Sequence, residues 1–147
     1  QLIEYNVRFG DPECQVLMMR LESDLVELML ACAERRLGEI EAPRMSDDFA
    51  LTVVMAAEGY PGTPKKGGEI DLDSAEENGA KIFHAGTKRD GGRLVANGGR
   101  VLNVTAKGAT ATEAQAAAYE AVDAVQFPDG FCRRDIGQRE VRRERHG

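Results

Sequence analysis

Three polar residues of different chemistry alternate near the start of the chain: Glu4, Asn6 and Arg8. In an extended strand alternate side chains share a face, so these three would line one surface while the intervening apolar residues point into a core. The intervening residues are Ile3, Tyr5, Val7 and Phe9. The spacing therefore predicts a strand with one packed face and one face free for chemistry.

The chemistry that fits this face is phosphoryl transfer. Magnesium takes oxygen ligands and is usually shared with substrate phosphates, so the carboxylate of Glu4 and the amide oxygen of Asn6 form a suitable pair of ligands. The guanidinium of Arg8 offers donors matched to a phosphate or carboxylate. A half-exposed edge strand with ordinary polar residues outside explains the same three positions, and the spacing does not decide between the two interpretations.

Composition narrows the class of protein. A chain of 147 residues with 42% hydrophobic content can bury the core of one domain or slightly more. The net charge of −6 argues against a general nucleic-acid binder, which gains affinity from a basic surface. No apolar run approaches the roughly 18 residues typical of a membrane span, and no signal-peptide order is present. We expect a cytoplasmic protein with no membrane or nucleic-acid partner.

The cysteines and histidines indicate no metal or disulfide site. Cys14, Cys32 and Cys132 are odd in number and contain no C-x-x-C pair, so we expect free thiols. His84 lies in a strand-like stretch, where a packed or hydrogen-bonded imidazole is expected. Because the sequence opens at Gln1 and a strand follows at once, we also expect a piece of a longer protein whose preceding part pairs with that strand.

Two helices and a linker follow the first strand. Asp11 before Pro12 predicts a helix start, with the aspartate as N-cap and the proline in the first turn. A second helix is expected after Ser23, which would cap it. The polar stretch 38–48, which contains Pro43, predicts a linker. The chain is therefore expected to divide into residues 1–44 and 48–147.

The second part has the sequence pattern of an α+β domain, with short strands and one helix. Short apolar runs separated by glycine-rich turns predict strands at 50–57, 81–85, 93–96 and 100–106, forming an antiparallel sheet or partly closed barrel. A helix is expected at 111–125, where Thr110 and Glu113 form a capping box and a stripe of small residues would pack on the sheet. The turn at 97–99 predicts a hairpin. The loop at 59–73 is either a mobile cover over a site or an irregular surface loop. The arginine-rich tail from Arg133 is expected to be solvated and frayed.

Several ordered motifs in the sequence resemble one enzyme family. Residues 8–15, Arg-Phe-Gly-Asp-Pro-Glu-Cys-Gln, resemble the signature of phosphoribosylamine-glycine ligase, an ATP-grasp ligase of de novo purine synthesis. The similarity continues through residues 23–28, 53–57, 59–62, 83–87, 97–102 and 131–137. It covers nearly the whole chain and is more specific than the Glu-x-Asn spacing alone.

The resemblance implies an activity and a set of residue roles. The reaction would join the carboxylate of glycine to the amine of 5-phosphoribosylamine through glycyl phosphate, with release of ADP and phosphate from ATP. Glu4 and Asn6 match the family's metal ligands for Mg²⁺ or Mn²⁺, and Arg8 matches an arginine that stabilises charge on the transferring group. Asp11 would contact the ammonium of glycine, although helix capping explains it equally. Arg100, beside the glycine turn, would reach the ribose phosphate, although a tight hairpin also accounts for that turn.

The resemblance also implies that part of the enzyme precedes this sequence. In this family most of the ATP-grasp apparatus lies N-terminal to the first strand, so residues 1–44 would end that domain and residues 48–147 would form the C-terminal domain. The isolated chain is then expected to be inactive and to need the rest of the enzyme. Two other hypotheses are a noncatalytic association module derived from such a ligase and an ATP-grasp ligase with another acceptor; the motif at 8–13 argues against the second.

Overall fold

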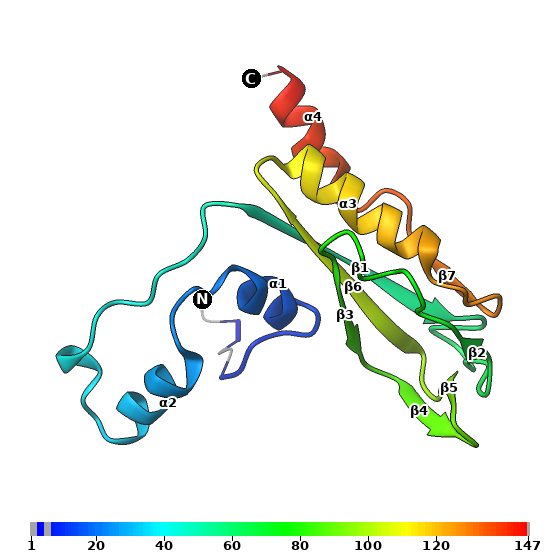
Figure 1. Ribbon diagram of the computed structural model, residues 1–147, viewed down its shortest axis with the longest axis horizontal. Coiled ribbons are helices and arrows are strands. Elements are labelled where there is room, and N and C mark those ends of the chain that lie inside the picture. The colour runs from blue at the N-terminus through cyan, green and yellow to red at the C-terminus, as the bar shows by residue number, and fades with distance from the viewer. Residues whose placement is uncertain (1–2, 5–6, 147) are drawn as a thin grey trace.

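The computed structural model describes residues 3–4 and 7–146, which form helices on both sides of a twisted antiparallel sheet (Figure 1). The N-terminal part contains α1 (Glu13–Arg20), α2 (Leu25–Ala33) and the 3₁₀ turn η1 (Leu37–Glu39). The rest contains β1 (Phe49–Ala57), β2 (Glu69–Ile70), β3 (Lys81–His84), β4 (Thr87–Asp90), β5 (Arg93–Ala96), β6 (Arg100–Gly108), α3 (Ala111–Ala124), β7 (Gly130–Cys132) and α4 (Gln138–His146). The α+β class and the antiparallel sheet are therefore confirmed.

The long strands β1 and β6 form the centre of a four-stranded sheet in the order β3-β6-β1-β7. Their antiparallel register places Val53 opposite Val104 and Met55 opposite Leu102, so that large apolar side chains pair on one face. The helix α3 covers this face with its buried stripe and closes the main core. The opposite face is partly covered by α1 (Figure 1).

A second sheet, in the order β2-β5-β4, continues from the first through a sharp bend. The hydrogen bonds run on through the bend, since Gly86 N–H donates to Arg100 O at 2.9 Å and Asn97 N–H donates to Gly86 O at 2.7 Å. A Cβ atom at Gly86 would lie 2.6 Å from the Arg100 carbonyl oxygen. Glycine is required here because two backbones approach closely.

The prediction of a hairpin at 97–99 is consequently wrong. The strands on either side of that turn, β5 and β6, belong to different sheets and do not pair with each other. The tight hairpin lies instead between β4 and β5, where Gly91 and Gly92 have φ values of 56° and 86°. The strands β2, β4 and β7 were not predicted, because β2 and β7 span only two and three residues and β4 contains no apolar residue to mark a buried face.

The C-terminal tail is ordered, contrary to expectation. Its helix α4 buries Val141, and Glu144 accepts hydrogen bonds from the backbone N–H groups of Ala111 and Thr112. Thr110 caps the same end, the N-terminus of α3, by accepting from Glu113 N–H at 3.1 Å. Carboxylates are stabilised at a helix N-terminus, so a tail that looks solvated in sequence is held by α3.

The predicted caps of the first two helices are also corrected. Pro12 occupies the N-cap position of α1 without a side-chain bond, and the Asp11 carboxylate serves other partners described below. At α2 the cap is Asp24, which accepts from Val26 N–H and Glu27 N–H, whereas the Ser23 hydroxyl accepts from Arg44 N–H. The residue expected to cap each helix is thus engaged elsewhere, and only α2 has another local side-chain cap, Asp24.

The segment predicted as a linker, residues 38–48, is hydrogen-bonded to the end of α1. After η1 the chain returns antiparallel to the end of α1, with Leu21 bridged to Met45 and Ser46 N–H donating to Arg20 O at 2.7 Å. The Arg20 guanidinium in turn donates to Ser46 O at 2.8 and 3.2 Å. The domain boundary at 44–48 stays a prediction.

The strand expected at the start of the chain is not formed in the described residues of that segment, 3–4 and 7–9. Ile3, Val7 and Phe9, which were expected to face a core, are all exposed, Val7 to 90%. Tyr5 and Asn6 lie outside the described residues. A strand needs a neighbour for its backbone groups and its apolar face, and no described strand lies beside this segment.

Candidate functional site

The structure brings together two of the predicted site residues that are 89 positions apart in sequence. Arg100, at the first position of β6, donates from Nη1 to the Asp11 carbonyl oxygen at 3.0 Å, and its Nη2 lies 3.3 Å from Asp11 Oδ2. Two different nitrogens of one guanidinium thus contact one residue, which orients the planar group. Asp11 immediately precedes α1, so this contact joins the start of that helix to the central strand.

Two further residues complete a polar cluster around Asp11. Asn103 Nδ2 donates to Asp11 Oδ1 at 3.3 Å, and Gln15 Nε2 donates to the same oxygen at 2.8 Å. Asn103 is only 1% exposed and lies between the buried residues Leu102 and Val104 in the middle of β6. A buried amide of this kind needs a partner, and Asp11 supplies it.

Sequence reasoning missed Asn103 and Gln15. The available signal was the single amide within the apolar run 101–106, because a polar residue in a buried strand implies a specific partner. The identity of that partner depends on how α1 packs against the sheet. This packing cannot be predicted from a local sequence pattern.

Arg100 also lines an apolar pocket of about 560 Å³ on the sheet face that α1 leaves open. Its floor is the face of β1, its walls come from the 60–61 turn and from the segment after β7, and Pro12 closes the side toward α1. The lining residues are Pro12, Thr52, Val54, Ala56, Tyr60, Pro61, Arg100, Phe131, Cys132, Arg133 and Ile136. An apolar cavity with a few placed charged groups is typical of a small-molecule site.

The wall after β7 is fixed by α3. Tyr119 of α3 donates its hydroxyl to Arg133 O at 2.8 Å and accepts from Ile136 N–H at 3.0 Å. Burial raises the pKa of this phenol, so it stays neutral and keeps its proton for the bond it donates. The Arg133 side chain pairs with Asp135 at 2.6 Å, which raises the pKa of the guanidinium further. Arg133 therefore lines the pocket with its guanidinium already paired with Asp135.

The predicted metal pair stays a prediction. The Glu4 side chain is exposed and Asn6 lies outside the described residues. Arg8 is exposed as well, and its guanidinium donates to the Phe9 carbonyl oxygen at 3.1 Å. Neither Glu4 nor Arg8 forms a hydrogen bond or ion pair with the Asp11–Arg100 cluster, so the described residues do not unite the two halves of the predicted site.

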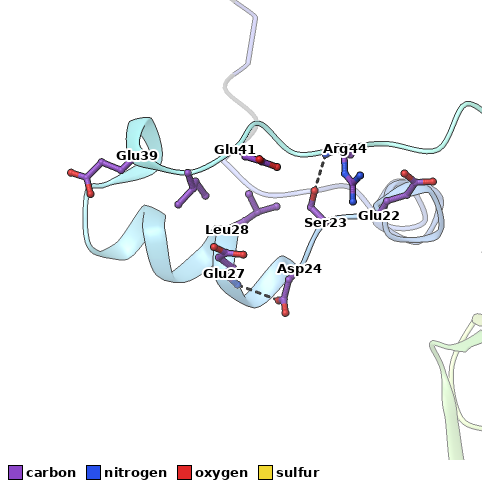
Figure 2. A pocket seen from close by; sticks show the side chains of 9 residues that line it. Glu22, Ser23, Asp24, Glu27, Leu28, Glu39, Glu41 and Arg44 are labelled. Atoms are coloured by element: carbon purple, nitrogen blue, oxygen red, sulfur yellow. Dashed lines mark hydrogen bonds between the residues drawn. The ribbon is translucent and has the colours of Figure 1, made fainter.

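A second cavity, of about 430 Å³, lies between the start of α2 and the returning segment 39–44. Figure 2 shows carboxylates from separate elements around it: Glu22 and Asp24 at one end, Glu39 at the other, with the Ser23 hydroxyl turned toward the backbone of Arg44. Asp24 is already engaged as the cap of α2. Within the described ranges no group of three His, Cys, Asp or Glu side chains is placed to hold a metal ion.

None of the three cysteines is fully buried, whereas His84 forms the hydrogen bond expected of it. Cys14, Cys32 and Cys132 are free, and burial raises the pKa of the Cys132 thiol, which lowers its reactivity. His84 Nδ1 lies 3.1 Å from the Thr87 hydroxyl, so the imidazole is hydrogen-bonded. Among the helices that the structure describes, none is long and apolar enough to cross a membrane.

Comparison with known proteins identifies the family. The family described as "Phosphoribosylglycinamide synthetase, C domain" matches residues 50–139. A phosphoribosylamine–glycine ligase of Mesorhizobium japonicum is 62% identical over 146 residues, which cover 99% of this chain and 34% of the relative. A chloroplastic phosphoribosylamine–glycine ligase of Arabidopsis thaliana is 53% identical over 148 residues, covering 98% and 28%.

A solved structure agrees with these relatives. The crystal structure of a phosphoribosylamine–glycine ligase from Thermotoga maritima matches 91% of this chain and 32% of its own, with 38% identity and a TM-score of 0.71. The chain belongs to the phosphoribosylglycinamide synthetase C-domain family and matches the C-terminal part of its relatives. It spans about a third of the length of the curated relatives it matches.

Proposed function

We propose that this chain is the C-terminal part of an ATP-dependent ligase that joins glycine to 5-phosphoribosylamine in purine biosynthesis. The observation that carries the proposal is the 62% identity to a phosphoribosylamine–glycine ligase along 99% of the chain. The reaction would proceed through glycyl phosphate and release ADP and phosphate in the cytoplasm. Residues 1–44 would complete the ATP-grasp domain, and residues 48–147 would form the C-terminal domain.

The pocket beside β6 is the proposed place for part of the ribosylamine substrate. Arg100 presents a permanent positive charge at the edge of an apolar cavity of about 560 Å³. A ribose phosphate has an anionic group for the guanidinium and a less polar body for the cavity. This arrangement supports Arg100 as the substrate-binding residue.

Glu4 and Asn6 are the proposed holders of Mg²⁺ or Mn²⁺. They fit by donor chemistry, because an exposed carboxylate and an amide supply the hard oxygen ligands these cations take. The bound cation would supply charge neutralisation at the nucleotide phosphates. Arg8, which is also exposed, would place a guanidinium where negative charge develops on the transferring group.

The N-terminal part of the chain offers a surface for the remainder of the enzyme. The helix α2 leaves large apolar side chains in solvent, with Met29 63% exposed, and an apolar groove of about 540 Å³ runs along it. Apolar surface of this extent on a soluble chain marks an interaction site. We assign it to the preceding two thirds of the longer protein, which would also supply a neighbouring strand for the described residues 3–4 and 7–9.

A chimeric enzyme tests the proposal. The C-terminal third of the Mesorhizobium japonicum relative would be replaced by this sequence, and ATP-dependent phosphate release would be measured with and without glycine and phosphoribosylamine. We expect release that requires both substrates, and none from the isolated chain. A folded chimera without activity would refute the ligase assignment and favour a noncatalytic association module.

The same chimera tests the metal pair. Glu4→Ala and Asn6→Ala should each abolish turnover while leaving the unfolding temperature nearly unchanged, because Glu4 is exposed and would act on bound nucleotide and not on packing. Unchanged turnover in either variant would remove that residue from the metal site.

A further inference from the structure

We propose that Asp11 is a positioning residue that fixes the Arg100 guanidinium in the pocket, and that it does not contact the ammonium of glycine. The inference rests on the proposed function and changes the role that the resemblance gives to Asp11. It also names the substrate whose binding depends on this aspartate, namely the phosphoribosyl group.

The first support is the engagement of the Asp11 carboxylate. Its Oδ1 accepts from Gln15 and from Asn103, and its Oδ2 pairs with Arg100. Both oxygens thus have partners inside the chain, two of which come from the central strand β6. Three of the roughly four lone-pair positions of the carboxylate are therefore used, which leaves about one for an incoming ammonium.

The second support is the way the guanidinium is held. An arginine at the first position of a strand has a long side chain with several rotamers, and a single contact would leave its plane free to turn. Here Nη1 binds the Asp11 carbonyl oxygen and Nη2 the Asp11 carboxylate, so two contacts orient the plane. Arginine has five N–H donors, so others remain for an anion in the pocket.

The third support is the position of the cluster. Arg100 and Pro12, the neighbour of Asp11, both line the pocket, whereas Asn103 anchors Asp11 from a site that is 1% exposed. Asp11 therefore connects a rigid, buried point of β6 with the arginine at the pocket edge. A residue held on both sides in this way transmits position to the binding group.

The experiment uses the active full-length chimera and compares Asp11→Asn, Arg100→Met and the double variant. Asp11→Asn should raise KM for phosphoribosylamine about threefold to fivefold and leave KM for glycine unchanged, since an ion pair between half-exposed side chains is worth a factor of that order. Because Asp11 acts through Arg100, the double variant should be no worse than Arg100→Met alone.

Two further variants separate positioning from folding. Asp48→Asn removes a comparable pair, with Lys107 at the other end of β6, and should leave both KM values unchanged. Asp11→Glu keeps the charge and should restore much of the KM for phosphoribosylamine. If the unfolding temperature shows that Asp11→Asn does not fold, Asp11→Glu replaces it as the test variant.

The outcomes are distinct. A raised KM for glycine, or effects of Asp11→Asn and Arg100→Met that multiply in the double variant, would overturn the positioning role in favour of direct contact. Unchanged KM values in Asp11→Asn would overturn it as well. If the unmutated chimera shows no turnover that depends on both substrates, the proposed function fails, and that result is independent of any Asp11 variant.

Discussion

The two parts of the chain use the same rules for helix formation but differ in what covers the helices. The helix α3 is capped by Thr110 and buries a stripe of small residues against the sheet. The helix α2 is capped by Asp24 in the same manner, yet it leaves most of its apolar side chains in solvent. Among the described residues before 49, Ala31 is the one buried hydrophobic residue.

The difference shows that a local signal and a packing partner are separate requirements. Capping and periodicity are sufficient to define both helices, but burial of apolar surface is what stabilises a helix in a protein. The part of the chain from β1 onward buries its apolar faces against its own elements. The segment before β1 forms helices but leaves the apolar face of α2 exposed. This agrees with the proposal that the rest of a longer enzyme covers that face.

The largest expected effect compares one leucine from each part. Leu102→Ala empties a fully buried position and should lower the free energy of unfolding by about 2 to 5 kcal/mol. Leu30→Ala, at a side chain that is 49% exposed, should change it by less than about 0.5 kcal/mol in the isolated chain. Chemical denaturation followed by circular dichroism measures both.

The same pair sharpens the comparison in the full-length chimera. If the rest of the enzyme covers α2, Leu30→Ala should become clearly destabilising there while the cost of Leu102→Ala stays the same. An equally small effect of Leu30→Ala in both proteins would mean that the α2 face stays exposed.

A smaller effect is expected from overfilling the contact between α3 and the sheet. Ala118 is fully buried, so Ala118→Leu should destabilise the isolated chain by about 1 to 3 kcal/mol through overpacking. Ala116→Leu is the matched control on the exposed side of the same helix and should be nearly neutral, because leucine and alanine have similar helix propensities. Equal unfolding midpoints for the two variants would show that the helix face is assigned wrongly.

The smallest expected effect concerns the acid end of the pH range. Hydrogen bonds from Thr112 and Ala111 lower the pKa of Glu144 below its ordinary value of 4.5. A lowered pKa in the folded state means that this stabilisation is present above pH 4.5 and is lost as the pH falls through the folded-state pKa.

Unfolding temperatures between pH 3 and pH 7 test this contribution. Glu144→Gln should lower the unfolding temperature at pH 7 and reduce its fall toward pH 3, because the variant has no carboxylate to protonate. Glu41→Gln, an exposed carboxylate of the returning segment, is the control and should leave the curve unchanged. A Glu144→Gln curve that runs parallel to that of the unmutated protein would contradict the proposed cap.

Several local features could be predicted from sequence because their causes are local. The predicted strands at 50–57, 81–85, 93–96 and 100–106 agree with β1, β3, β5 and β6 to within two residues at either end. The helix at 111–125 and its Thr110 cap are confirmed for the same reason, since periodicity and capping depend on neighbours in the chain.

Features that depend on distant partners could not be predicted. Glu144 was assigned to a frayed tail, although it binds the start of α3 from 32 or 33 residues away. The role of Gly86 and Gly98 was not predicted either, because it is the approach of two distant backbone segments that excludes a side chain there. One local detail also differs from the prediction: the Glu113 carboxylate does not complete the capping box with Thr110 but accepts from Ala109 N–H, one residue earlier.

The sequence by itself determined the family, the α+β class and the identity of the candidate residues, because these follow from motifs and from neighbours along the chain. Only the tertiary structure decided that Asp11 binds Arg100 and Asn103, which are 89 and 92 positions away, instead of capping its own helix. The physical reason is that a carboxylate takes the donors that folding brings to it, and a guanidinium together with a buried amide outweighs a backbone N–H that water can satisfy.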